Sequence, residues 1–173
     1  MNKGWRLAEE SDLSENKQAT YTKKELKKYL KNLVKKQDGL TAFSFEFQSG
    51  QSSYHTRLRI LITSEKIEHQ KTQRKTRSSS PDKKNATAVK KIGFSTEKLS
   101  AFVEQLLKCK IWDMENCVER ALPDTALLTF IIRDHDNLVF EQEVWESCRN
   151  DDKRTKDLIR SISALLPPDW TPP

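Results

Sequence analysis

The chain has 173 residues, of which 35% are hydrophobic and 32% are charged. Ordinary globular domains contain roughly 45–50% apolar residues, glycine included, and about 25% charged residues. No stretch of the chain approaches the roughly 18 apolar residues that a membrane span needs. The composition therefore excludes a membrane protein and a disulfide-dense scaffold, and it favours one soluble domain that carries several polar segments.

The N-terminus has no apolar core of the kind found in signal peptides. The cysteines Cys109, Cys117 and Cys148 are odd in number and show no paired spacing. We therefore expect reduced thiols and a cytoplasmic location.

The net charge of +6 is unevenly distributed along the chain. Residues 21–94 carry eighteen basic and six acidic side chains, whereas residues 95–173 carry ten basic and fifteen acidic ones. Such a dipole can steer an anionic partner or bring two copies together head to tail, unless the basic side chains are simply solvated.

Three helices are predicted from apolar residues that recur with helical spacing. The first spans residues 22–37, where Thr22 and Glu25 form a capping box and Gly39 follows the last turn. The second runs from Thr96 to Lys108, with Ser95 as N-cap, and the third starts near residue 150 and stops at Pro167.

Alternating apolar and polar residues predict strands at 40–48 and 54–62, with a weaker edge strand at 66–75. Residues 125–133 are apolar on both faces, as in a central strand, and residues 138–146 return as its hairpin partner after a tight turn.

The element order is thus α-β-β-(β)-α-β-β-α. It predicts a two-layer α+β fold in which three helices stack on an antiparallel sheet of 4–5 strands. The order is similar to that of small bacterial secretion chaperones, which are dimers that bind extended polypeptide, and this resemblance of order implies a binding role.

We expect one domain at residues 21–168, preceded by a flexible arm at 1–20 and followed by a Pro-rich tail at 169–173. A mobile basic loop is predicted at about 76–91 because its Ser-rich, charged sequence cannot pack in a core. Trp170 is interpreted as a cap on the domain, with insertion into a partner as the alternative.

Motifs for catalysis or cofactor binding are missing from the sequence. The four glycines are too scattered for a phosphate-binding loop, and the histidines and cysteines lack zinc-ligand spacing. We therefore predict no catalytic residues, no metal and no cofactor.

Basic side chains are the remaining candidates, as contacts for an anionic partner. Their lysine-rich composition fits phosphate contacts better than base reading. The candidate residues are Lys24, Lys28, Lys31, Lys35, Arg57, Arg59, Lys71, Arg74, Lys75 and Arg77.

The leading hypothesis is a non-enzymatic, chaperone-like binding or adaptor domain whose partner is a protein, a peptide or a second copy. The alternative is nucleic-acid binding, to RNA or DNA with weak sequence specificity, through the lysine-rich helix and the basic loop. An enzyme with a non-standard site is a third class without residue support. No membrane partner is expected.

Overall fold

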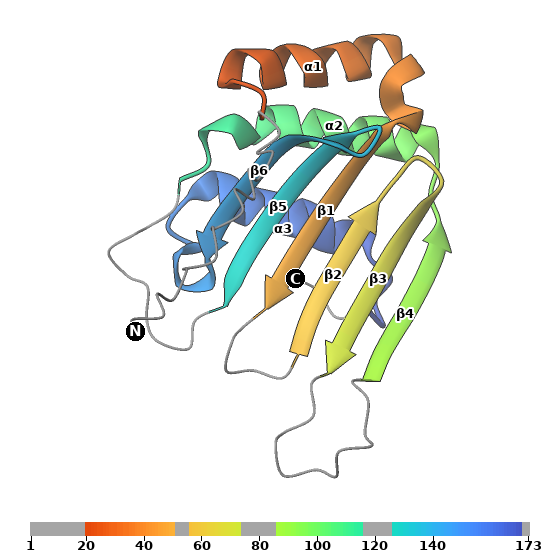
Figure 1. Ribbon diagram of the computed structural model, residues 1–173, viewed down its shortest axis with the longest axis vertical. Coiled ribbons are helices and arrows are strands. Elements are labelled where there is room, and N and C mark those ends of the chain that lie inside the picture. The colour runs from red at the N-terminus through yellow and green to blue at the C-terminus, as the bar shows by residue number, and fades with distance from the viewer. Residues whose placement is uncertain (1–19, 51–55, 74–85, 116–125, 171–173) are drawn as a thin grey trace, which may run out of the picture.

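The fold is a two-layer α+β arrangement, shown in Figure 1 for the computed structural model. Residues 20–50, 56–73, 86–115 and 126–170 are described, and within them lie three α-helices and one antiparallel sheet of six strands. The strand order is β4-β3-β2-β1-β5-β6. The helices are α1 (Lys23–Lys36), α2 (Thr96–Lys108) and α3 (Lys153–Leu165), and the strands are β1 (Phe43–Gly50), β2 (Thr56–Ile62), β3 (Lys66–Gln73), β4 (Ala86–Gly93), β5 (Leu127–Asp134) and β6 (Asn137–Trp145).

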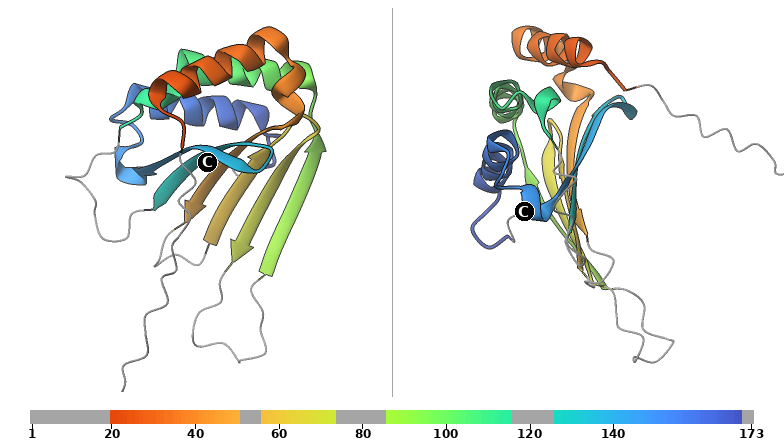
Figure 2. Two further views of the ribbon diagram at one scale, coloured as in Figure 1. Left: turned by 45° about the horizontal axis from the view of Figure 1, so that its top comes forward. Right: turned by 90° about the vertical axis from the view of Figure 1, so that its left-hand side faces the viewer.

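The helices lie on one side of the sheet only. Figure 2 shows α2 and α3 against that side, with α1 packed beside α2 at the end of the strands. No helix in the described ranges is both long and apolar enough to cross a membrane.

The α+β class, the antiparallel sheet and the three helices are confirmed, but the predicted 4–5 strands are too few. The additional strand is β4, which includes residues 86–91 of the segment predicted to be a loop. Because β4 pairs with β3, the strand predicted at 66–75 is internal rather than an edge. Residues 87–90 of β4 are exposed on both faces, so their sequence lacks the alternation by which a half-buried strand is found.

The ends of α1 show what the capping residues do. The Glu25 amide donates to the Thr22 hydroxyl over 3.3 Å, and the Thr22 amide donates to the Glu25 carboxylate over 2.8 Å, which confirms the capping box. The residue in left-handed conformation at the exit is Gln37 (φ 56°), not Gly39. Gly39 is needed for space, because a Cβ there would lie 2.7 Å from Leu33 Cδ2.

The core lies between the two layers and is built from one face of each element. Phe45 of β1 meets Phe102 of α2 edge to face at 5.1 Å between ring centroids, and Phe47 lies 5.4 Å from Phe130 of β5. The predicted tight turn between β5 and β6 is also confirmed, with His135 and Asp136 at positive φ as a hairpin of type I′ requires.

Two cysteines lie in the described residues. Cys109 is a buried free thiol, and Cys148 is disulfide-bonded. Cys148 is thus not the reduced thiol predicted from the sequence. Whether two cysteines form a disulfide depends on their proximity in the fold rather than on their spacing in the chain. The cytoplasmic location stays a prediction.

The C-terminal segment after α3 closes the helix side of the sheet near β3. Trp170 is buried, and its ring lies 5.2 Å from that of His69 on β3, which confirms its interpretation as a cap. Its neighbour Asp169 pairs with Lys90 of β4 at the surface over 3.6 Å. The segment therefore anchors on an aromatic ring, with a weaker ionic contact beside it.

Replacing Trp170 by alanine (Trp170→Ala) is expected to lower the free energy of unfolding by about 3 kcal/mol, because a large buried ring is lost. Replacing Asp169 by asparagine (Asp169→Asn) removes only the exposed ion pair and is expected to cost under about 1 kcal/mol. Urea unfolding followed by circular dichroism measures both. Equal losses for the two variants would contradict an anchor made by the ring.

Candidate functional site

The side of the sheet that faces away from the helices, here called the open face, carries a mixture of charged, polar and apolar side chains from the central strands. In β1 the three phenylalanines belong to the core, and the residues between them point to the open face. The cross-strand register arranges open-face residues in rows from β3 to β6. The rows are Thr72, Arg57, Gly50, Leu127 and Trp145; then Gln70, Arg59, Gln48, Thr129 and Glu143; then Glu68, Leu61, Glu46, Ile131 and Glu141.

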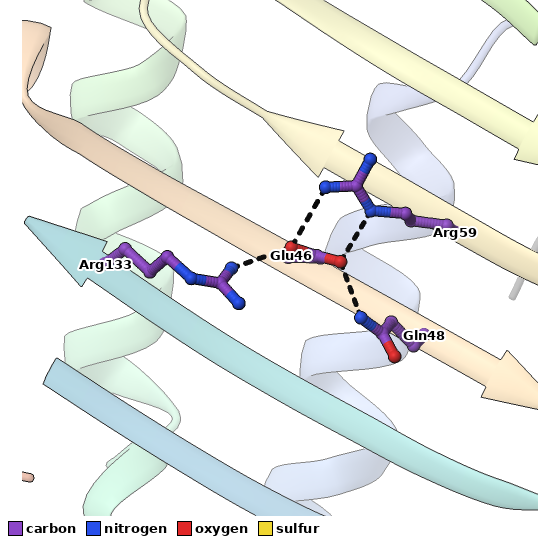
Figure 3. A network of polar contacts seen from close by, with 4 residues as sticks. All are labelled: Glu46, Gln48, Arg59 and Arg133. Atoms are coloured by element: carbon purple, nitrogen blue, oxygen red, sulfur yellow. Dashed lines mark hydrogen bonds and ion pairs between the residues drawn. The ribbon is translucent and has the colours of Figure 1, made fainter. Parts of the chain in front are cut away.

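A network of four side chains occupies the centre of this face (Figure 3). The guanidinium of Arg59 on β2 donates to both carboxylate oxygens of Glu46 on β1, through Nε at 2.6 Å and Nη2 at 3.2 Å. Arg133 of β5 donates to Oε2 at 2.7 Å, and the Gln48 amide donates to Oε1 at 2.6 Å. One carboxylate therefore bridges three adjacent strands.

The surroundings of Glu46 keep its carboxylate ionised. Its side chain is only 3% exposed, and such burial raises the pKa of a carboxyl group. Hydrogen bonds from Arg59, Gln48 and Arg133 outweigh this effect and lower the pKa to about 2. The same contact raises the pKa of Arg59. Glu46 is therefore a fixed anion at neutral pH.

A hollow of about 520 Å³ adjoins the network toward the lower end of β1 and β2. It spans four strands, which at about 4.8 Å between neighbours is a width of roughly 14 Å. The described residues that line it include two cations and no anion. They are Gln48, Ser49, Gly50, Arg57, Leu58, Arg59, Gln70, Thr72, Leu127 and Thr129.

The open face is not uniformly basic. Toward β6 two of the three rows end in the exposed carboxylates of Glu143 and Glu141, and the third ends at Trp145. On the opposite side, Glu68 of β3 pairs with Lys66 over 3.2 Å and with Lys91 over 3.4 Å, and hydrogen bonding to Lys66 first of all lowers the pKa of Glu68. The face therefore presents a basic hollow beside an acidic border.

The structure brings only two of the candidate site residues together, namely Arg57 and Arg59 in the hollow. The four candidate lysines of α1 are exposed on that helix, at the opposite end of the strands from the hollow. Lys71 lies opposite Leu58 and thus on the helix side of the sheet. The structure does not describe Arg74, Lys75 and Arg77.

Several residues of this face were not predicted from the sequence. Glu46 lies between phenylalanines in β1, where alternation indicated an ordinary solvated position, and it is 2% exposed instead. Arg133 joins it from 87 positions away in the chain. The one available signal in the sequence was a carboxylate in β1 followed by arginines on the next strand. It identifies the network only if the register between the two strands is known.

No protein-family model matches the chain, and none of the curated proteins matches it significantly. Within the described ranges, no group of three or more His, Cys, Asp or Glu side chains is placed to hold a metal ion. The site is therefore interpreted from its own geometry.

The Glu46 network predicts a pH-dependent stability. A pKa lowered from 4.5 to about 2 means that ionised Glu46 stabilises the folded state above pH 4.5, and that this stabilisation is lost as the pH falls toward 2. The shift corresponds to about 3 kcal/mol. The variant Glu46→Gln is therefore expected to unfold more easily than the wild type at pH 7, by about 3 kcal/mol, and the gap is expected to close near pH 2.

Denaturant unfolding at a series of pH values between 7 and 2.5 measures this gap. Glu143→Gln, an exposed carboxylate on the same face, serves as the control and is expected to change stability by under about 0.5 kcal/mol. A Glu46→Gln gap that stays constant across the series would contradict the proposed ionisation.

Proposed function

We propose that this protein is a non-enzymatic binding domain that takes a polypeptide partner on the open face of its sheet. The observation that carries the proposal is the hollow beside the Glu46 network, on a sheet face that no described helix covers. A face of mixed polar and apolar residues with a local depression fits a non-obligate protein interface, which is about as polar as the rest of a protein surface.

The network supports this function through preorganisation. Arg59 and Gln48 line the hollow, and both donate to Glu46. Side chains that are already held in place lose less conformational entropy when a partner binds. The same hydrogen bonds that stabilise the sheet therefore favour binding beside it.

The state of Glu46 favours binding over catalysis. It is the buried carboxylate nearest the hollow, but its oxygens accept four hydrogen bonds and its pKa is about 2. An efficient general base has a pKa near the working pH and a free lone pair for the proton. Glu46 meets neither condition at neutral pH, so it supports a structural role.

A polypeptide fits the charges of this face better than a polyanion does. The row that contains Arg59 ends at the carboxylate of Glu143 on β6, and the adjacent row, that of Glu46, ends at Glu141. A phosphate backbone laid across these rows would meet like charge, whereas a polypeptide can place side chains of either sign. The width of roughly 14 Å accommodates about four extended residues.

Selection of a random 12-residue peptide library against the protein tests the proposal. Enriched peptides are expected to bind about tenfold more weakly to Thr129→Trp, because an indole at this position fills the hollow without changing its charge. The control Ala164→Trp places the same ring on the exposed surface of α3, and binding is expected to be unchanged. No enrichment, or peptides sensitive only to Ala164→Trp, would refute a binding function of the open face.

The lysine stripe of α1 supports nucleic-acid binding as a second candidate function. Lys24, Lys28, Lys31 and Lys35 recur along the helix, and all four are exposed. Their distance from the end of β3 that leads into the predicted basic loop counts against one continuous basic surface (Figure 1). What remains is a single helix face able to neutralise a few phosphates.

Fluorescence anisotropy with a labelled single-stranded RNA and a duplex DNA, at about 50 and 200 mM salt, tests this candidate. Binding through α1 is expected to fall steeply with salt, and to be lost when the four lysines are changed to glutamate. Arg57→Gln, remote from α1, is the control. Absence of binding at 50 mM salt would eliminate this second function.

A further inference from the structure

We propose that the hollow binds the carboxylate of an aspartate or glutamate side chain in the partner polypeptide, with Arg57 as its principal contact. This inference rests on the proposed function, because it assigns a chemical class to the partner of the same face. It follows from the charge of the hollow, the state of Arg57 and the shape of the site around it.

The charge of the hollow favours an anion. Its described lining contains Arg57 and Arg59 and no acidic residue. The nearby anion Glu46 is shared between two guanidinium groups, so the network keeps an excess of one positive charge. Arg57 adds its own charge beside this network, so the hollow is a positive part of the open face.

Arg57 differs from the other arginines that the structure describes. The structure describes six arginines, and the five besides Arg57 form ion pairs with carboxylates, at positions 59, 133, 149, 154 and 160. Arg57 is exposed, and in the described part of the chain it has neither an ion pair nor a side-chain hydrogen bond. Its planar fork of donors is therefore available for bidentate contact with a carboxylate.

Gly50 and Arg59 shape the site around this fork. A Cβ at Gly50 would lie 3.3 Å from Arg57 Cγ, so the absence of a side chain lets Arg57 lie close over β1. Arg59 uses Nε and Nη2 for Glu46, which leaves three of its five N–H donors for a ligand. Thr72, Gln70 and Thr129 add neutral polar groups at the rim.

A carboxylate side chain suits the hollow better than a nucleic-acid phosphate. No aromatic residue is among the described residues of its lining, so a base has no stacking partner there. Glu143 stands at the β6 end of the row of Arg59 and Glu141 at the end of the next row, and both would repel the adjoining phosphates. A single carboxylate flanked by neutral residues avoids both problems.

Titration of the ¹⁵N-labelled full chain with acetyl-Ala-Glu-Ala-amide, followed by NMR, tests the inference. We expect shifts of the amide signals of Gly50, Arg57 and Thr129, and a dissociation constant about tenfold weaker for the Gln analogue of the peptide. Arg57→Gln is expected to weaken binding of the Glu peptide about tenfold. Arg57→Lys is expected to weaken it less, because lysine keeps the positive charge but lacks the planar fork of N–H donors. Arg160→Gln, on α3, is the control and should leave binding unchanged.

The other outcomes separate this inference from the function on which it rests. Equal binding of the Glu and Gln peptides, or indifference to Arg57→Gln, overturns the carboxylate assignment and leaves polypeptide binding by the open face intact. Absence of shifts in the amide signals of the open face overturns the carboxylate assignment as well. If an oligonucleotide binds more tightly than the Glu peptide, and this binding is lost in Arg57→Gln, the hollow would be assigned to nucleic acid instead.

Discussion

The shared carboxylate of Glu46 is the interaction on which the open face depends. Removing a carboxylate from water costs several kcal/mol unless charges and hydrogen bonds replace its hydration. Glu46 receives both from β2 and β5, so these strands and β1 are tied together on the side that no described helix covers. The same contact sets the orientation of Arg59, and with it one wall of the hollow.

The one-sided helix layer explains why such a network is needed. A sheet whose helices cover one face gains most of its hydrophobic stabilisation there, and its other face must not attract other sheets. Side chains of both signs satisfy this requirement in the central strands. At the edge strand β4, Lys90 and Lys91 place charge where an unpaired strand would otherwise recruit another chain.

Local signals in the sequence were sufficient for the helices, the capping box, five of the strands and the turn at His135 and Asp136, because each depends on neighbouring residues. They were not sufficient for β4, because its exposed residues show no contrast between a buried face and a solvent-facing one. The site was harder still. Arg57 and Arg59 were among the candidates, but Glu46 and Arg133 meet only through the pairing of β1 with β2 and β5. That pairing is part of the tertiary structure, and no residue spacing along the chain reveals it.

Under the proposed function, the arginines of the open face divide the tasks of stability and binding between them. Arg59 and Arg133 are committed to Glu46, whereas Arg57 contributes no ion pair among the described residues. Arg57 and Arg59 are two positions apart on one face of β2, about 7 Å along the strand, so their like charges repel. An anion held between them removes that repulsion and adds hydrogen bonds that only the folded sheet can offer. If a partner carboxylate binds in the hollow as proposed, it stabilises the fold by linkage, and it supplies the counter-charge that Arg57 lacks among the described residues.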